Sequence, residues 1–445
     1  MSAVAENKHL HKIYVRALSG VNSLDEIQIT GGRALEGSVI VQGSKNAALP
    51  MMAASLLHRG VSVLRGCPRI TDVYCMEEIL KKLGAVSRWE GKDLYLDCTW
   101  ADGTEISGDS TGRMRSSVIL LGAMLGRSGR GTVGYPGGCV IGKRPVDIHV
   151  FALRCLGVSV QEKENGITAR RLRPAGGTVV FPKKSVGATE QAVLSSVLSD
   201  GETVLKNCAR EPEIVWLCRY LRGMGACITG EGSSCIRIQG VSTLNGGDLR
   251  VPADRIVAGT YLCAAAATRG RIIIENPPEG ELDAFLDLYR KIGGQYEGKS
   301  GKLIADGRNV RFPVTFLETE AYPGFPTDLQ SPVMAVLATI PGESHIRENI
   351  FEDRFRLAGE LNKMGAAVRV SGKDAWIRGT ETLRGCPVTA CELRGGAALV
   401  LAALAARGDT VIRGYSYIRR GYEHICSDLA GLGAVIREIH RNSFI

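Results

Sequence analysis

A short phrase ending in glycine recurs six times along the 445 residues of the chain. Its copies include LKKLGAV (80–86), LRGMGAC (221–227) and LAGLGAV (429–435). The phrase glycines are Gly84, Gly157, Gly225, Gly293, Gly365 and Gly433. They lie about 70 residues apart, a period much longer than that of common solenoid repeats. Six units of this size predict two similar domains of three units each.

A second glycine recurs upstream of each phrase. This series is Gly60, Gly131, Gly201, Gly270, Gly342 and Gly408, and each member follows an Ala/Leu-rich stretch and precedes a β-branched run such as RIIIEN. Glycine just past a helix favours the left-handed conformation that ends it, and Val/Ile/Thr runs favour strands. We therefore predict that helices and strands alternate in each unit and that both glycines end helices. An ordinary α/β protein with recurring glycine caps is the alternative, but two glycine series in one register speak against it.

Composition narrows the class of protein. The chain is 44% hydrophobic and 23% charged, a globular balance, and has no apolar run long enough for a transmembrane helix. Residues 1–23 lack an apolar signal core, so we expect a loose extension there. Thirteen cysteines, an odd number, predict a reduced cytoplasmic compartment. The net charge of +9 comes without a basic run, which favours small anionic ligands over nucleic acid.

The first helix of each unit is predicted to begin at a similar segment, such as GSKNAALP (43–50) or FPTDLQS (325–331). Charged residues occupy near-equivalent places in these segments: Lys45, Arg115, Asp254, Arg255, Asp328, Glu392 and Arg394. An acid at a helix start is ordinarily a cap, whereas a cation there opposes the helix dipole. A shared anionic ligand would explain Lys45 and Arg115. Equivalent helix starts from two domains, facing each other, would form an anion-binding cleft.

The segment PGGCVIGKRPVD (136–147) places Cys139 among glycines, in a predicted mobile loop. Lys143 and Arg144 follow it and would favour the thiolate, so we interpret Cys139 as functional rather than as a small core residue. A helix is expected to start at Arg144-Pro145. The matches GDSTG (108–112) and GCVIGK (138–143) are interpreted as accidental, the first because it lies in a predicted polar loop. No histidine or cysteine spacing indicates a metal, and no motif indicates a cofactor.

Motifs in order along the chain resemble those of the UDP-N-acetylglucosamine 1-carboxyvinyltransferases, a family of enolpyruvyl transferases. The resemblance runs from about Ile27 to the C-terminus and rests on these segments: GSKNAALP (43–50), PGGCVIGKRPVDIH (136–149), SVGATE (185–190), AREPEIV (209–215), FPTD (325–328), FEDRF (351–355), ELR (392–394) and RRGYEHI (419–425). It implies two inside-out α/β barrel domains, each of three βαβαββ-like units. Residues 45–252 would form the domain with the cysteine loop, and residues 24–44 plus 253–445 a discontinuous second domain.

The resemblance also implies an addition–elimination reaction in peptidoglycan synthesis. The 3′-hydroxyl of UDP-N-acetylglucosamine would add to C2 of phosphoenolpyruvate, a proton would reach C3, and phosphate would leave. Cys139 would donate the proton, form a covalent adduct with phosphoenolpyruvate and be the target of fosfomycin. Asp328 would take the hydroxyl proton, and Lys45, Arg144 and Arg420 would hold phosphoenolpyruvate. The nucleotide sugar would be bound or enclosed by Asn46, Arg115, Arg144, Pro145, Val146, Asp147, Ile148, Lys183, Ser185, Val186, Gly187, Asp328, Ile350, Glu392 and Arg394.

The sequence departs from the family pattern at four places. Glu392 replaces an Asp, Val257 a Glu, Gln191 an Asn, and Lys143 a small residue. These changes leave open a paralogue acting on a different nucleotide sugar, or a non-catalytic regulator that binds a UDP-sugar. Enolpyruvylshikimate-phosphate synthase, with the same fold, is the nearest rival but carries no such cysteine loop. An RNA-end-binding protein is supported only by the net charge. The sequence predicts no membrane partner, no nucleic-acid partner and no particular oligomeric state.

Overall fold

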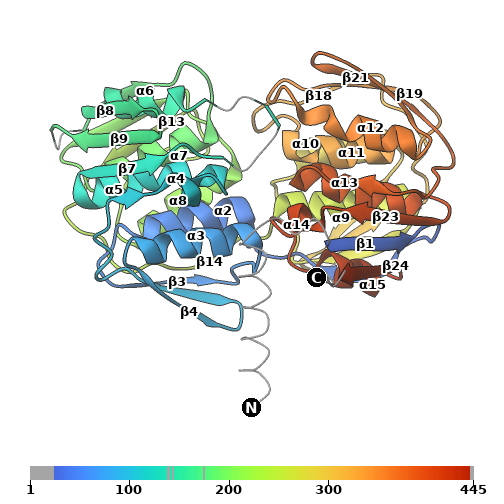
Figure 1. Ribbon diagram of the computed structural model, residues 1–445, viewed down its shortest axis with the longest axis horizontal. Coiled ribbons are helices and arrows are strands. Elements are labelled where there is room, and N and C mark those ends of the chain that lie inside the picture. Colours follow the sequence, from blue (N-terminus) through green and yellow to red (C-terminus); the bar gives the residue numbers. More distant parts are fainter. Residues whose placement is uncertain (1–24, 138–140, 143–144, 174–175, 441–445) are drawn as a thin grey trace, which may run out of the picture.

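A computed structural model describes residues 25–137, 141–142, 145–173 and 176–440. The predicted N-terminal extension, residues 1–23, lies outside the described residues, as do Cys139, Lys143 and Arg144. Two lobes lie side by side, each with helices in its middle and sheets on its outside (Figure 1). Within the described ranges, no helix is long and apolar enough to cross a membrane.

The strands of the described residues form six four-stranded sheets with one shared pattern. In each sheet the first two strands are parallel and the later pairs antiparallel. The sheets of lobe 1 are β14(Asp248–Arg250)-β3(Val61–Arg65)-β5(Asp93–Asp97)-β4(Val86–Glu90), β6(Glu105–Ile106)-β7(Arg130–Gly134)-β9(Gly166–Arg171)-β8(Val158–Lys163) and β10(Thr178–Val180)-β11(Glu202–Lys206)-β13(Cys235–Gln239)-β12(Cys227–Thr229). Those of lobe 2 are β2(Glu36–Ile40)-β15(Arg271–Glu275)-β17(Lys302–Asp306)-β16(Gln295–Lys299), β18(Leu317–Glu318)-β19(Gly342–Arg347)-β21(Asp374–Gly379)-β20(Ala367–Ser371) and β22(Val388–Thr389)-β23(Asp409–Arg413)-β1(Asp25–Thr30)-β24(Val435–His440).

Each unit contributes one central and one outer helix. The central helices, buried along most or all of their length, are α2(Lys45–Ser55), α5(Leu120–Ser128), α7(Val186–Ser196), α9(Arg255–Thr268), α11(Gln330–Leu337) and α13(Leu393–Ala405). The outer helices bury one face and are α3(Thr71–Lys82), α6(Asp147–Cys155), α8(Pro212–Gly223), α10(Asp283–Lys291), α12(Leu357–Lys363) and α15(Ile425–Gly431). Short helical turns are α4(Gly108–Thr111), α14(Tyr415–Ile418), η1(Arg115–Ile119), η2(Thr327–Leu329) and η3(Arg354–Arg356). Central helices and outer sheets confirm the predicted inside-out barrels of βαβαββ units.

The buried apolar residues form two separate cores. One core takes its residues from 47–251, which defines lobe 1. The other takes them from 27–41 and 256–432, which defines lobe 2. We propose that each lobe is one domain; the limits 45–252 and 24–44 plus 253–445 stay a prediction.

The chain passes between the lobes at two adjacent segments. The Ser44 amide donates to the Pro252 carbonyl (2.7 Å), and the Asp254 amide donates to the Gln42 carbonyl (2.9 Å). A Cβ added at Gly43 would lie 2.4 Å from the Gly66 carbonyl oxygen, so only glycine fits this crossing. The crossing therefore holds the first residues of α2 and α9 beside each other.

The two glycine series differ in their role. All six phrase glycines have positive φ, from 71° at Gly157 to 103° at Gly225, as predicted for helix ends. Of the upstream series, Gly60, Gly131 and Gly270 lack positive φ, so the prediction that they end helices by this conformation is wrong. Helix α9, for example, ends at Arg269 (φ 56°). Gly270 instead allows close packing, because a Cβ there would lie 2.3 Å from the Leu35 carbonyl oxygen.

Candidate active site

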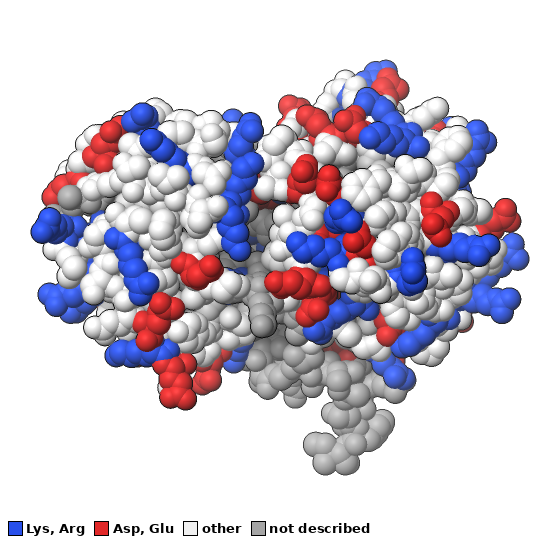
Figure 2. All heavy atoms as spheres, turned by 90° about the horizontal axis from the view of Figure 1, so that it is seen from above, with Lys and Arg blue, Asp and Glu red and all other residues white. Residues whose placement is uncertain are grey.

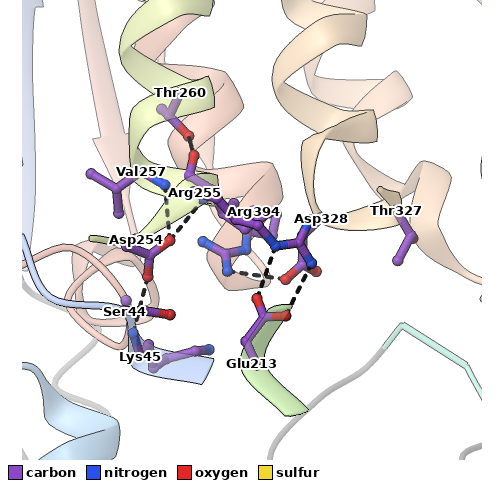
Figure 3. Close-up of polar contacts among 12 residues, drawn as sticks. Ser44, Lys45, Glu213, Asp254, Arg255, Val257, Thr260, Thr327, Asp328 and Arg394 are labelled. Atoms are coloured by element: carbon purple, nitrogen blue, oxygen red, sulfur yellow. Dashed lines mark hydrogen bonds and ion pairs between the residues drawn. The ribbon is translucent and has the colours of Figure 1, made fainter. Parts of the chain in front are cut away.

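The starts of α2 and α9, which belong to different lobes, share one carboxylate. Asp254 Oδ1 accepts hydrogen bonds from the Ile256 and Val257 amides of α9 (2.8 and 3.0 Å), and its Oδ2 accepts from the Lys45 amide of α2 (3.0 Å; Figure 3). The interpretation of Asp254 as a cap is thus confirmed. The shared cap fixes the backbone of Lys45 against lobe 2.

The side chain of Lys45 belongs to a small ionic group at the junction. Lys45 Nζ lies 3.5 Å from Asp72 Oδ2, and Arg420 Nε of lobe 2 donates to Asp72 Oδ1 at 2.8 Å. Burial lowers the pKa of Lys45, and Asp72 opposes that shift. Burial pushes the pKa of Asp72 upward, but Arg420 and Lys45 outweigh it and the pKa lies below its usual value. Two cations, one from each lobe, therefore share a buried, ionised carboxylate.

Asp328 lies at the start of the fifth unit but does not cap a helix. Its Oδ1 accepts from Arg354 Nη2 (2.6 Å) and its Oδ2 from Arg394 Nη2 (3.0 Å). Burial alone would raise the pKa of Asp328; Arg394, Arg354 and Lys45 outweigh burial and hold that pKa far below its usual range. Glu392 is the cap of α13, where it accepts from the Arg394 amide (2.8 Å) and the Gly395 amide.

Sequence reasoning gave no role to Arg354 or to Asp72. Arg354 lies in the FEDRF segment, outside the repeated helix starts, and its buried guanidinium lies 4.0 Å from Glu392 as well as beside Asp328. We name Lys45, Asp72, Asp328, Arg354, Arg394 and Arg420 the junction group. Four cations and two carboxylates can bind a small molecule with several negative charges and can accept a proton from it or its partner.

Arg255, one of the charged residues at the repeated helix starts, forms a closed pair with a carboxylate of the other lobe. Its Nε and Nη2 donate to Glu213 Oε1 and Oε2 at 3.0 and 3.3 Å, from lobe 2 to lobe 1 (Figure 3). Both side chains are buried. Burial lowers the pKa of Arg255, but the charge and hydrogen bonds of Glu213 outweigh burial and raise it.

The loop that contains Cys139 is described only in part. The Ile141 carbonyl accepts from the Asp353 amide of lobe 2 (3.0 Å), so the chain two residues after Cys139 lies beside the segment with Arg354. Arg115 Nη2 donates to the Pro145 carbonyl (3.0 Å), which joins two predicted binding segments. Helix α6 begins at Asp147 with Val146 as its cap. The predicted start at Arg144-Pro145 is therefore wrong by about one turn.

A cavity of about 630 Å³ lies between the lobes, next to other predicted binding residues. It is lined by Ile350, Asn349 and Thr319 of lobe 2 and by Lys184 of lobe 1, within the predicted stretch 183–187. Ser185 in that stretch caps α7, whose first residues are Val186 and Gly187, and Asn46 is the second residue of α2. Figure 2 shows the furrow between the lobes, with basic side chains in a column on its lobe 1 edge and acidic ones opposite.

Three of the unusual residues have defined surroundings. Val257 is fully buried in α9, and Glu392 acts as the cap described above. Gln191 Oε1 accepts from His149 Nδ1 at 2.5 Å, if that nitrogen carries the proton. Gln191 Nε2 is buried and has no hydrogen-bond partner among the described residues. The GDSTG match is not a polar loop, because it follows strand β6 and forms α4; its Ser110 is buried and accepts from Lys82 Nζ (2.6 Å).

Metal ligands are not gathered anywhere in the part of the chain that the structure describes. No three His, Cys, Asp or Glu side chains lie close enough together there to hold a metal ion. Each cysteine of the described ranges is a free thiol.

Comparisons with known proteins place the chain in a family. The profile described as EPSP synthase (3-phosphoshikimate 1-carboxyvinyltransferase) matches residues 29–429. UDP-N-acetylglucosamine 1-carboxyvinyltransferase 2 of Caldanaerobacter subterraneus subsp. tengcongensis is 40% identical over 94% of this chain and 100% of its own length. The UDP-N-acetylglucosamine 1-carboxyvinyltransferase of Thermus thermophilus is 44% identical over 92% of this chain and 95% of its own.

Solved structures show the same fold. The enolpyruvyl transferase NikO of Streptomyces tendae has a TM-score of 0.84 at 24% identity and covers 94% of this chain and 100% of its own. An EPSP synthase of Acinetobacter baumannii has a TM-score of 0.70 at 18% identity over 93% and 100% of the two chains. The chain belongs to the enolpyruvyl transferase family, and within it to the UDP-N-acetylglucosamine 1-carboxyvinyltransferases.

Proposed function

We propose that the protein transfers the enolpyruvyl group of phosphoenolpyruvate to the 3′-hydroxyl of UDP-N-acetylglucosamine and releases phosphate, the first committed step of peptidoglycan synthesis. The observation that carries the proposal is the junction group, in which four cations surround Asp328 and Asp72 between the lobes. Relatives with this activity in their names match nearly the whole chain. The free thiols of the described residues agree with a cytoplasmic location, which is part of the proposal.

The reaction has two balanced steps. In the addition, the sugar oxygen forms a bond to C2 of phosphoenolpyruvate, its proton passes to a base, and C3 receives a proton from an acid. In the elimination, C3 loses a proton, the bond from C2 to the phosphate oxygen breaks, and inorganic phosphate leaves. The products are the enolpyruvyl ether of the nucleotide sugar and phosphate. One base, one acid and cations for the leaving group are required.

Asp328 is the proposed base for the sugar hydroxyl. Its pKa is held low mainly because Arg394 and Arg354 oppose the effect of its burial. A carboxylate held in this way is a weak base, since an efficient base has a pKa nearer the working pH. Lys45 is a third cation that lowers this pKa, so an anionic substrate that binds Lys45 would neutralise part of that charge and raise the pKa of Asp328. Binding of phosphoenolpyruvate would thus make Asp328 a better base when the acceptor is present.

The cations divide between two proposed tasks. Lys45 and Arg420 would bind phosphoenolpyruvate, because both reach the junction and neither is fully enclosed by protein. Arg354 and Arg394 would orient Asp328. Cys139 as proton donor and Arg144 as a third ligand of phosphoenolpyruvate complete the proposal, and both lie outside the described residues.

The cavity beside Ile350 and Lys184 is the proposed site of the nucleotide sugar. Its volume of about 630 Å³ lies within the range for pockets that enclose small molecules. Arg115, with its bond to the Pro145 carbonyl, would contribute from lobe 1, as would Lys183, the neighbour of Lys184 in the chain. Glu392 and Arg394 would complete the site from lobe 2.

Phosphate release tests the proposal. Purified protein should release phosphate only when phosphoenolpyruvate and UDP-N-acetylglucosamine are both present. A panel that also contains shikimate-3-phosphate and other nucleotide sugars checks the acceptor. Release that is equal with shikimate-3-phosphate, or greatest with another nucleotide sugar, would refute the acceptor; no release with any acceptor would refute the activity and favour a sugar-binding regulator.

A further inference from the structure

Asp72 lies at the meeting point of two cations that come from distant parts of the chain. It is the second residue of α3, and its side chain is only 4% exposed. Arg420 of lobe 2 donates to both oxygens, from Nε to Oδ1 (2.8 Å) and from Nη2 to Oδ2 (3.4 Å). Lys45 Nζ donates to Oδ2 at 3.5 Å. The carboxylate therefore connects α2, α3 and the segment after α14.

An acid near a helix start is ordinarily explained by the helix dipole. That explanation does not account for Asp72, because its carboxylate is bonded to side chains from other elements. A carboxylate so deeply buried costs several kcal/mol unless cations neutralise it, and the two cations that do so are those proposed to bind substrate. The stability of helix α3 does not require that Asp72 be buried between Lys45 and Arg420.

We infer that Asp72 is a positioning residue that holds Lys45 and Arg420 together as one binding pair for an anionic group of phosphoenolpyruvate. The inference rests on the proposed function. Two like charges from different lobes repel each other, and a carboxylate between them removes that repulsion. Because Arg420 donates to both of its oxygens and Lys45 donates to Oδ2, Asp72 also fixes the directions in which both cations point.

Asp72 has a second effect, on the proton of Lys45. Burial lowers the pKa of Lys45, and so do the charges of Arg394 and Arg420. The charges of Asp72 and Asp328 raise it. Without Asp72, Lys45 would lose its proton at a lower pH. Since an uncharged amine binds an anion poorly, the activity would then decline at a lower pH on the alkaline side.

The test compares Asp72→Asn, which keeps the shape and removes the charge, with Asp72→Glu, which keeps the charge and displaces it. The rate constants kcat and KM for each substrate are measured across the pH range. In Asp72→Asn the alkaline limb of kcat/KM for phosphoenolpyruvate should move down by about one pH unit or more, the usual effect of one adjacent charge. In Asp72→Glu the limb should stay in place, while KM for phosphoenolpyruvate rises. KM for the nucleotide sugar should change little in either variant.

Asp283→Asn is the matched control, because Asp283 is an exposed acid in the first turn of α10, the equivalent helix of the fourth unit. It should leave both constants and the alkaline limb unchanged. Calorimetric titration with inorganic phosphate follows the anion site without turnover, and the affinity of Asp72→Asn should fall more steeply with pH than that of the wild type. An unmoved limb in Asp72→Asn, or an unchanged KM for phosphoenolpyruvate in Asp72→Glu, would overturn the inference while wild-type turnover upholds the proposed function. A wild type without turnover would refute the function, and phosphate titration would then still test the role of Asp72.

Discussion

Two carboxylates at equivalent places of the repeat reach across the junction, and their partners differ. Asp72 is the second residue of α3 in the first unit, and Glu213 is the second residue of α8 in the third. Glu213 receives both donors of one arginine, Arg255, and both side chains are nearly enclosed. Asp72 is shared by Arg420 and Lys45, which remain 17% and 13% exposed.

The difference shows that the same position of the repeat can stabilise the fold in one unit and support the proposed reaction in another. In the pair of Arg255 and Glu213 the hydrogen bonds are bidentate and the charges balance. The arginine therefore has no uncompensated charge with which to bind an anion. In the junction group the cations outnumber the carboxylates, and two of them, Lys45 and Arg420, keep contact with solvent. We therefore expect substitutions of Glu213 to change stability, and substitutions in the junction group to change activity.

Asp328→Asn should have the largest effect. Loss of the proposed base should lower kcat by up to about 10⁴-fold, because Asn cannot take the hydroxyl proton. The melting temperature should change far less, since the amide oxygen can still accept from one of the two arginines. Steady-state kinetics and thermal unfolding of the same sample test this contrast. Near wild-type turnover would remove Asp328 from the chemistry.

Glu213→Ala should lower the free energy of unfolding and leave kcat nearly unchanged. Removal of one partner leaves Arg255 buried with its charge uncompensated, which costs about 3–5 kcal/mol of unfolding free energy. Denaturant titration measures that cost, and kcat of the folded fraction should stay near the wild-type value. A large loss of kcat without a loss of stability would contradict the division between the two carboxylates.

The double variant Glu213→Leu with Arg255→Met should nearly recover the wild-type stability. Apolar side chains of similar size need no neutralising partner, so the unfolding free energy should come within about 1 kcal/mol of wild type. The comparison with Glu213→Ala separates the cost of an unpaired charge from the loss of packing. A double variant as unstable as Glu213→Ala would show that packing, and not charge, dominates there.

The smallest expected effect is in the pH dependence of stability. Burial, with Glu213 and Glu211 adding to it, raises the pKa of Glu190 well above its usual value. Such a carboxyl supports the fold below its ordinary pKa of about 4.3, and this support is lost as the pH rises. Glu190→Gln should therefore stabilise the protein at neutral pH and give no gain near pH 4. Unfolding measured at several pH values tests this, and a gain independent of pH would contradict it.

Asp72 and Asp328 have the opposite dependence on pH. Their pKa values lie below the usual range, because their cations outweigh the effect of burial. The stability they contribute is present above the ordinary carboxyl pKa of about 3.9 and is lost as the pH falls below it. As the pH falls, the contribution of Glu190 to the free energy of unfolding should therefore increase, whereas the contributions of Asp72 and Asp328 should decrease.

Local sequence patterns predicted the repeat, the phrase glycines and the six helix starts, because short-range backbone preferences decide them. They failed for Gly60, Gly131 and Gly270, which lack positive φ; at Gly270 close packing against the Leu35 backbone requires glycine instead. Arg255 was grouped only with the charged residues of the helix starts, because its place in a helix start is visible in the sequence and its partner Glu213 is not.

Asp72 and Arg354 escaped notice because their partners lie far away along the chain. Asp72 meets Arg420 across 348 residues, and nothing in ITDVYC separates it from an ordinary first-turn acid. Arg354 lies within the FEDRF segment and begins η3, outside the register of the helix starts. Docking of the two lobes decides the pairing of Asp72 with Arg420, and packing of separate segments within lobe 2 decides the pairing of Arg354 with Asp328 and Glu392. Short sequence patterns carry little information about either.

The most direct test of the account is the mass of the product. The protein is incubated with phosphoenolpyruvate and UDP-N-acetylglucosamine, and the nucleotide sugar is examined by mass spectrometry while phosphate is assayed in the same mixture. The account predicts a nucleotide sugar heavier by one enolpyruvyl group, formed in equal amount to the phosphate released. An unchanged nucleotide sugar, whether or not phosphate is released, would contradict it.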